Sequence, residues 1–258
     1  MTLAAVAPPL IAYALAFQAV VYLLLPHRRR STWAPVTTGA VGAGLIVAAA
    51  TIFGPAELGL SPGRPLDAVL WGLAAGLCCV IGGVALLGTE KGRRWLADPR
   101  ASRISSRQAV ATFLIRIPLL TALVEEALFR GLLHAVLVSL YPIETAVLLG
   151  AALFGLWHVA PGLERARAGG GDRRIHITLT VLSTTVAGLF LVWLRVETGS
   201  IWAPAAVHAA VNMTMTLFAR AAFNRAPAEA GDSLPACTYA VSSFGSPVPS
   251  QEVPSGSA

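Results

Sequence analysis

Residues 109–140 read AVATFLIRIPLLTALVEEALFRGLLHAVLVSL, an apolar stretch with ionisable side chains deep inside it. A helix needs about 20 predominantly apolar residues to cross a bilayer, and this stretch is longer than that. A charged side chain at the bilayer centre costs roughly 2.5–3.5 kcal/mol or more. Glu125, Glu126 and Arg130 therefore indicate either a functional site or an ion-pair cluster that braces a helix bundle.

The composition of the whole chain indicates the same environment. Of its 258 residues, 55% are hydrophobic and 12% are charged, and the mean hydropathy is +0.69. A soluble domain carries roughly 25% charged residues. We therefore expect much of the surface to face lipid. Three cysteines at positions 78, 79 and 237 form neither a disulfide framework nor a CxxC zinc motif.

Apolar runs predict an all-α fold, a polytopic membrane helix bundle with about seven transmembrane helices. The expected spans are Ala4–Leu25, Ala34–Phe53, Leu66–Leu87, Ala109–Leu140, Thr145–Val159, Ile177–Leu194 and Ala203–Ala219. The fourth is too long for a simple perpendicular crossing, and we expect Pro118 to separate an interfacial entry from the span itself.

The chain divides into three segments on this pattern. Residues 1–107 hold the first three spans and a basic loop, residues 108–220 hold a helical core with the ionisable residues, and residues 221–258 form a tail. From about Pro227 the tail is rich in Pro, Ser, Gly and Ala, a composition typical of disorder.

Lysine and arginine are distributed unequally between the loops. Fifteen of the 19 fall on one side of the predicted spans, and only Arg64 and Arg195 fall on the other. The positive-inside rule then predicts an outside N-terminus and a cytoplasmic C-terminus in a multi-pass protein of the cell membrane. The same distribution explains the net charge of +6 without a nucleic-acid partner.

Helix geometry gives the two adjacent glutamates different surroundings. Glu126 and Arg130 are four residues apart, so they share a helix face and can pair. Glu125 points about 100° away from Glu126. Glu125 is thus left free to act as a general base, unless the group serves only to brace the bundle.

Two later spans contribute the remaining polar candidates. His158 ends the fifth span and shares a helical face with Phe154, which can form a wall of a site. His208 and Asn212 are four residues apart in the last span, where two donors can hold a developing oxyanion. Each of these residues also fits a purely structural hydrogen bond between helices.

Three motifs occur in order within residues 108–220, and together they resemble a known family. Glu125 to Arg130 matches EExxxR, Phe154 to His158 matches FxxxH, and His208 to Asn212 matches HxxxN. Their order and spacing resemble the CPBP family of CAAX prenyl proteases and bacteriocin-processing enzymes, also called Abi proteins. The stretch Thr198-Gly199-Ser200-Ile201-Trp202-Ala203-Pro204 resembles that family's lead-in to its last motif.

The resemblance implies a glutamate-dependent intramembrane endopeptidase. Glu125 and His158 would activate water, and His208 and Asn212 would stabilise the tetrahedral oxyanion. Glu126, Arg130 and Phe154 would support the site. Because the family is often called metalloprotease, zinc held by Glu125, His158 and His208 is a second mechanism, and these are normal zinc ligands.

Other functions compete with proteolysis. A non-catalytic scaffold or immunity-type protein would keep the bundle and the motifs without turnover. A proton-coupled transporter would show inverted repeats or paired broken helices, and the sequence has neither. The expected partners of a protease are the lipid bilayer and a peptide or membrane-protein substrate, prenylated or not.

The predicted spans set one geometric difficulty. His158 would lie near the inner surface of the membrane, and His208 would lie nearer the outer surface. The two can meet if the last helix starts deep, after a re-entrant turn at Glu197–Trp202 that is buried or lines a water cavity, or if the span boundaries differ from those predicted.

The predicted orientation can be tested with reporter fusions. A reporter that is active only in the cytoplasm should be silent at Gly59 and active at Gly170, because the arginine bias places these loops on opposite sides. Equal signals from both positions would contradict the orientation.

Overall fold

The computed structural model describes residues 27–98, 110–169 and 172–225, together with Ala16. Those residues form helices and connecting turns and contain no strand, which confirms the all-α fold class. The first predicted span, Ala4–Leu25, and the predicted tail after Arg225 lie outside the described residues, and the three-segment division of the chain stays a prediction.

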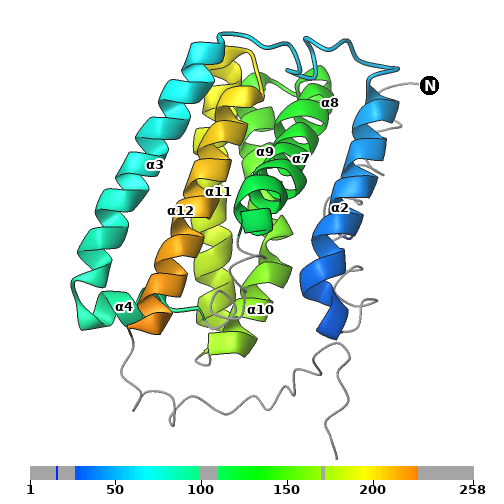
Figure 1. Ribbon diagram of the computed structural model, residues 1–258. Coiled ribbons are helices and arrows are strands. Elements are labelled where there is room, and N and C mark those ends of the chain that lie inside the picture. Colours follow the sequence, from blue (N-terminus) through cyan, green and yellow to red (C-terminus); the bar gives the residue numbers. More distant parts are fainter. Residues whose placement is uncertain (1–15, 17–26, 99–109, 170–171, 226–258) are drawn as a thin grey trace, which may run out of the picture.

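The helices stand side by side as a bundle (Figure 1). In chain order the elements are α2 His27–Ala49, α3 Pro65–Leu87, α4 Glu90–Leu96, the π-helical η1 Thr112–Leu123, α7 Val124–Glu126, the π-helical η2 Ala127–Leu133, α8 His134–Leu140, α9 Ile143–Trp157, α10 Val159–Gly169, α11 Arg173–Thr198 and α12 Trp202–Asn224.

Three helices among the described residues are long and apolar enough to cross a membrane: Pro65–Leu87, Ile143–Arg167 and Arg173–Thr198. Large apolar side chains cover their outer surfaces. Leu73 on α3 is 67% exposed, and Val186 on α11 is 66% exposed. Such faces are stable against lipid and not against water. The protein is therefore a helical membrane protein, and the predicted number of about seven spans stays a prediction.

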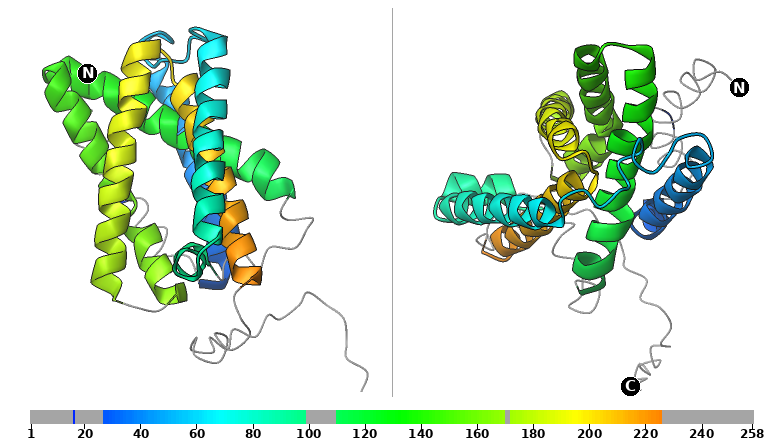
Figure 2. Two further views of the ribbon diagram at one scale, coloured as in Figure 1. Left: turned by 90° about the vertical axis from the view of Figure 1, so that its left-hand side faces the viewer. Right: turned by 90° about the horizontal axis from the view of Figure 1, so that it is seen from above.

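Residues 110–140 form one continuous helix through the middle of the bundle (Figure 2). Two of its stretches, η1 and η2, are π-helical, and α7 is the short α-helical turn between them. Pro118 lies inside η1 and does not break this helix, and the expected separation of an interfacial entry from the span stays a prediction. Proline lacks the backbone N–H and clashes with the preceding turn, so a wider π-type turn accommodates it within the helix. The glutamate pair occupies the α-helical turn between the two π stretches.

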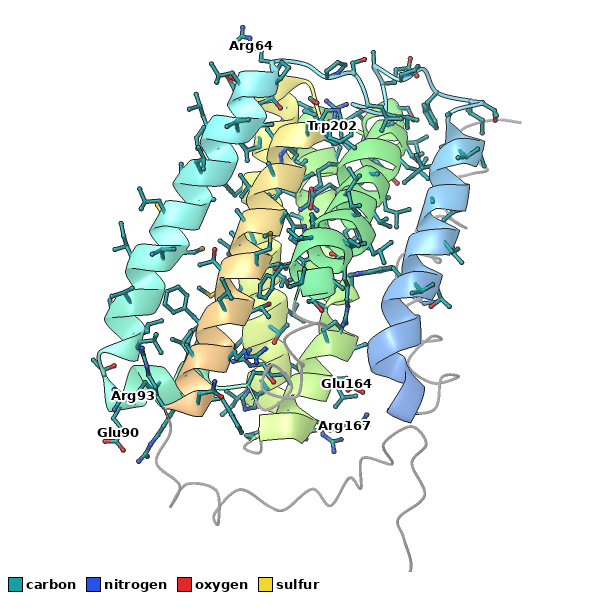
Figure 3. The ribbon with its side chains drawn as sticks, viewed as in Figure 1. Arg64, Glu90, Arg93, Glu164, Arg167 and Trp202 are labelled. Atoms are coloured by element: carbon teal, nitrogen blue, oxygen red, sulfur yellow. The ribbon has the colours of Figure 1, made fainter. Side chains whose placement is uncertain are left out.

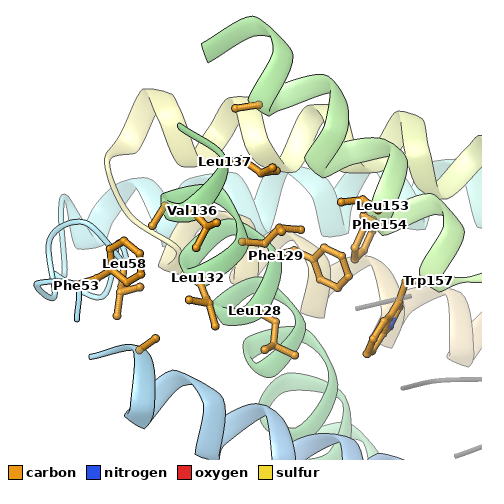
Figure 4. Close-up of a cluster of buried hydrophobic side chains, with 14 of the residues drawn as sticks. Phe53, Leu58, Leu128, Phe129, Leu132, Val136, Leu137, Leu153, Phe154 and Trp157 are labelled. Carbon is orange, nitrogen blue, oxygen red and sulfur yellow. The ribbon is translucent and has the colours of Figure 1, made fainter. Parts of the chain in front are cut away.

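A hydrophobic cluster fixes this central helix against its neighbours (Figure 4). Phe129 of η2 packs edge-to-face against Phe154 and Trp157 of α9, at centroid distances of 5.1 and 5.4 Å. Aromatic pairs in this arrangement add about 0.5–1.5 kcal/mol beyond burial. The cluster thereby sets the position of the EExxxR turn relative to the FxxxH helix.

Close packing of α9 on α11 depends on Gly155. A Cβ atom at that position would collide with Thr185 and would come within 2.9 Å of the Val181 carbonyl oxygen. Helix pairs in membranes approach closely where a small residue faces the partner backbone. Gly155 lies inside the FxxxH motif, so it lets α11 approach the part of α9 that carries His158.

A loop between α2 and α3 covers one end of the bundle and holds the turn before α12. The backbone N–H of Ile201 donates to the Gly59 carbonyl at 2.9 Å, and the Ser200 hydroxyl donates to the Ser61 carbonyl at 2.9 Å. The α11 helix ends at Gly199, whose φ of 65° is the left-handed conformation common at helix C-termini. These bonds fix where α12 begins.

Arg195 joins the same loop to the central helix. Its Nε donates to the Arg130 carbonyl oxygen at 3.1 Å, and its Nη2 donates to the Glu57 carbonyl oxygen at 3.0 Å. The side chain is 7% exposed. Arg195 therefore belongs to the last turn of α11 and not to a loop, with its guanidinium turned inward to satisfy backbone carbonyls, and the side of the membrane on which it lies stays a prediction.

Gly59 offers a test of this loop. Its φ is 66°, and a Cβ atom there would collide with the Arg195 guanidinium. Gly59→Ala should lower the free energy of unfolding in detergent by about 1–3 kcal/mol, the cost of a strained backbone residue. Gly54→Ala is the matched control, because a Cβ at Gly54 meets no atom within 4 Å. Equal stability of the two variants would contradict the role of the loop.

Candidate functional site

Glu126 is the most buried member of the ionisable cluster, with 0% of its surface exposed. Its Oε1 accepts a hydrogen bond from Arg130 Nη1 at 3.1 Å, as the four-residue spacing predicts. The same Oε1 lies 2.8 Å from His208 Nδ1 on α12. The prediction that Glu126 is neutralised within its own helix was therefore incomplete, since it also binds a residue of the HxxxN motif.

The Arg130 guanidinium is held on three sides. It is 2% exposed, and its Nη2 donates to the Gly188 carbonyl oxygen on α11 at 3.2 Å. Its Cζ lies 4.1 Å from the ring centroid of Phe154. A cation over an aromatic face gains about 2 kcal/mol or more when water is excluded. Arg130 thus links α11, α9 and Glu126 at one point.

Glu125 faces a different set of groups. Its Oε2 lies 4.0 Å from His158 Nε2 and 3.9 Å from His208 Nε2. This oxygen is buried and accepts no hydrogen bond from the described residues. The structure therefore brings three of the predicted site residues together, and each comes from a different helix.

Hydrogen bonds at Nδ1 orient both histidine rings. His158 Nδ1 lies 2.8 Å from the Phe154 carbonyl oxygen, which can only accept, so His158 carries its proton on Nδ1. His208 Nδ1 likewise donates to the Glu126 carboxylate. An acceptor behind a histidine fixes which nitrogen faces the site. Both Nε2 atoms are directed to Glu125.

Phe154 separates the arginine from the histidines. Its ring centroid lies 4.7 Å from that of His158 and 6.0 Å from that of His208. Arg130 covers the ring as well. The expectation that Phe154 forms a wall of the site fits this position, because the ring lies next to all three side chains.

Asn212 lies one helical turn beyond His208 on α12 and is half-buried. Its side chain makes no hydrogen bond to a residue that the structure describes, while its carbonyl oxygen accepts from Thr216 Oγ1 at 2.7 Å. Its amide is thus available to a molecule that enters beside His208, and its proposed role stays a prediction.

The difficulty over the depth of the two histidines is resolved by the length of one helix. The span expected at Thr145–Val159 was too short: α9 continues directly into α10, and together they cover Ile143–Arg167. His158 lies at the junction and therefore inside the span, not at its end. His208 lies two turns inside α12, after the turn held by Gly59, so both reach Glu125 at one level.

Two features of the site were missed from the sequence. The Glu126–His208 contact joins residues 82 positions apart, and spacing along the chain carries no signal for it. The sequence did contain a signal for Arg195, because an arginine near the end of an apolar span indicates a residue that needs a polar partner. His134 is buried in the first turn of α8.

Zinc ligands are present by type but not by spacing. Donors held at 2.0–2.1 Å by a tetrahedral zinc ion stand about 3.4 Å apart. The distances from Glu125 Oε2 to the two Nε2 atoms are 4.0 and 3.9 Å, which is wider. No group of three or more His, Cys, Asp or Glu among the described residues is arranged to hold a metal ion.

The fold and the site together define a class: a helical membrane protein with two carboxylates and two histidines enclosed in its bundle. Residues 107–214 match the family model described as type II CAAX prenyl endopeptidase, Rce1-like. These residues make up less than half of the chain, and over them it is similar to this family of CAAX-type membrane proteases, which supports the resemblance to the CPBP family of intramembrane proteases. No curated protein and no solved structure matches the chain.

The buried Glu126–Arg130 pair can be compared with an exposed pair of the same spacing. Glu126→Gln should lower the free energy of unfolding by about 3–5 kcal/mol, because it leaves Arg130 buried without its partner. The matched control is Glu90→Gln, since Glu90 pairs with Arg94 four residues on but both side chains are mostly exposed. That change should cost at most about 1 kcal/mol.

Unfolding by a denaturing detergent measures both changes on the same scale. A double variant Glu126→Gln/Arg130→Gln should lose less stability than the sum of its single variants, because the two residues share one interaction. Equal losses for Glu126→Gln and Glu90→Gln would contradict the buried pair.

Proposed function

We propose that this protein hydrolyses a peptide bond of a membrane-associated protein or peptide, with water activated by Glu125 and His158. The observation that supports this most directly is the convergence of Glu125 Oε2 and His158 Nε2 at 4.0 Å. Both atoms are hydrogen-bond acceptors, and two acceptors that face each other are stable only with a donor between them.

The spacing suits a water molecule as that donor. A water with two hydrogen bonds of about 2.8 Å bridges acceptors roughly 4–4.5 Å apart. The substrate water would donate one O–H to Glu125 and the other to His158, and its oxygen lone pairs would remain free to attack. Glu125 then takes a proton as the water oxygen bonds to the carbonyl carbon, and it returns a proton to the leaving amine.

The position of His208 supports its role as the oxyanion partner. Glu126 accepts from Nδ1 of its ring at 2.8 Å, and Glu125 lies 3.9 Å from Nε2. These two carboxylates would stabilise a second proton on Nε2, which would make the ring an imidazolium. That Nε2–H can donate to the oxyanion, and the Asn212 amide is the second donor.

A metal-assisted mechanism is the alternative for the same residues. Zinc held by Glu125, His158 and His208 would lower the pKa of a bound water and polarise the substrate carbonyl. The distances between these ligand atoms do not match zinc, so the proposed mechanism uses no metal.

The proposal also includes the predicted orientation, with the N-terminus outside, and residence in the cell membrane.

The substrate class follows from the position of the site. Glu125 is 6% exposed within the bundle, so the scissile bond must be brought there from the membrane or its surface. A prenylated protein and an unprenylated peptide precursor both satisfy this requirement. A non-catalytic scaffold, by contrast, would not need a buried acceptor that points to two histidines.

Glu125→Gln separates the enzyme from the scaffold. The glutamine keeps the shape of the side chain and removes the base, so the variant should fold and lose activity. New protein N-termini are compared between membranes with the wild type and with the variant. The wild type should produce at least one cleaved precursor that the variant leaves intact. Identical sets of N-termini from folded proteins would favour the scaffold.

Asn212 separates direct water attack from metal assistance. If its amide donates only to the oxyanion, Asn212→Ala should lower kcat and kcat/KM together by about 10²–10³, with little change in KM. Asn212→Asp should be worse than alanine, because a carboxylate repels the oxyanion.

The opposite order would identify a ligand. Asn212→Asp could bind zinc at least as well as asparagine, and zinc would then partly restore the alanine variant. Activity of the purified variants is therefore measured together with their metal content. An Asn212→Asp enzyme as active as the wild type, with metal bound, would overturn the oxyanion role.

A further inference from the structure

The far ends of α3 and α12 lie beside α4, whose Glu90 and Arg93 are labelled in Figure 3. A groove is formed between these two helix ends. Its volume is about 550 Å³, within the range of sites that hold small ligands. The lining residues are apolar or small, with one exception: Val84, Leu87, Gly88, Phe218, Ala221 and Arg225. The exception, Arg225, gives the apolar groove one cationic end.

A second guanidinium lies beside the same end. Arg93 Nη1 donates to the carbonyl oxygen of the lining residue Leu87 at 3.0 Å. Neither Arg93 nor Arg225 is paired with a carboxylate of the described residues. The nearest acid in sequence, Glu90, is bound to Arg94. Two cations with free donors thus stand at one end of an apolar groove.

The helix α4 marks this end of the bundle as a membrane–water interface. It follows the apolar α3 directly, and it carries Lys91 and two arginines. Its Trp95 is 62% exposed. Exposed tryptophan beside arginine at the end of a span is typical of the headgroup region.

We propose that this groove binds one anionic glycerophospholipid, with an acyl chain between α3 and α12 and the phosphate at Arg93 and Arg225. Arginine is suited to phosphate because its planar fork offers paired donors. Basic pockets between spans bind anionic headgroups in this way. Choline headgroups also carry a phosphate, but their ammonium group would be repelled by the two arginines.

This lipid site is separate from the proposed catalytic residues. Phe218 lies ten residues beyond His208 on α12, which is roughly 15 Å along a helix. The bound lipid would bridge α3 and α12 at the end of the bundle where α4 lies, beyond the part of α12 that carries His208. Its binding does not depend on whether the protein is a protease.

Native mass spectrometry of the purified full-length protein in detergent tests the proposal. The probes are phosphatidylglycerol and phosphatidylcholine with identical acyl chains. Wild-type protein should retain one phosphatidylglycerol at least about tenfold more strongly than phosphatidylcholine. Each arginine near an anionic headgroup contributes a factor of about five. Arg225→Gln should thus weaken retention by about fivefold, and Arg93→Gln/Arg225→Gln by tenfold or more.

The matched control is Arg94→Gln, which removes the same charge from α4 but not from the groove. It should retain the lipid as the wild type does. Ala221→Phe should lose the lipid with both arginines intact, because the ring fills the groove. Arg225 is exposed, so Arg225→Gln tests the site even where Ala221→Phe does not fold.

Three results would overturn the proposal. The first is equal retention of the two lipids, and the second is equal loss from Arg94→Gln and Arg225→Gln. The third is displacement of phosphatidylglycerol by inorganic phosphate alone, which would show that the anion binds without the groove.

Discussion

One buried carboxylate organises the part of the bundle that carries the three motifs. Glu126 accepts a hydrogen bond from Arg130 on its own helix and from His208 on α12. A charged group enclosed in a membrane protein is stable only when its partners are also enclosed and correctly placed. A shift of α12 against the central helix would break the bond to His208 and leave the His208 Nδ1 donor without its buried acceptor. The contact therefore fixes the relative position of these two helices.

The remaining polar contacts extend this constraint to α11 and to the loop before α3. Arg130 donates to the Gly188 carbonyl, and the Arg130 carbonyl accepts from Arg195, which also holds the loop through Glu57. The guanidiniums satisfy backbone carbonyls where water is scarce, so each contact is costly to lose. Oε2 of Glu125 accepts no hydrogen bond from the residues that the structure describes. This oxygen is the group that the proposed reaction uses.

Local rules of helix chemistry were sufficient to predict the fold class and the pairing of Glu126 with Arg130. They were also sufficient to select His158 and His208, because polar residues are rare in apolar spans. These local rules failed to predict features that depend on contacts between residues far apart in the sequence. The depth of His158 depends on the continuation of α9 into α10 beyond the apolar run, and the inward turn of Arg195 depends on carbonyls of a distant loop.

The proposed reaction requires that Glu126 hold a proton on Nδ1 of His208. Nitrogen-15 NMR of protein labelled at histidine, with the resonance of His208 assigned by its loss in His208→Gln, measures this directly. We predict that Nδ1 of His208 carries a proton in the wild type, and that Glu126→Gln changes the shifts of both ring nitrogens of His208 while Nδ1 of His158 stays protonated through Phe154. A His208 whose Nδ1 lacks a proton in the wild type, or whose shifts are unaffected by Glu126→Gln, would contradict the claim.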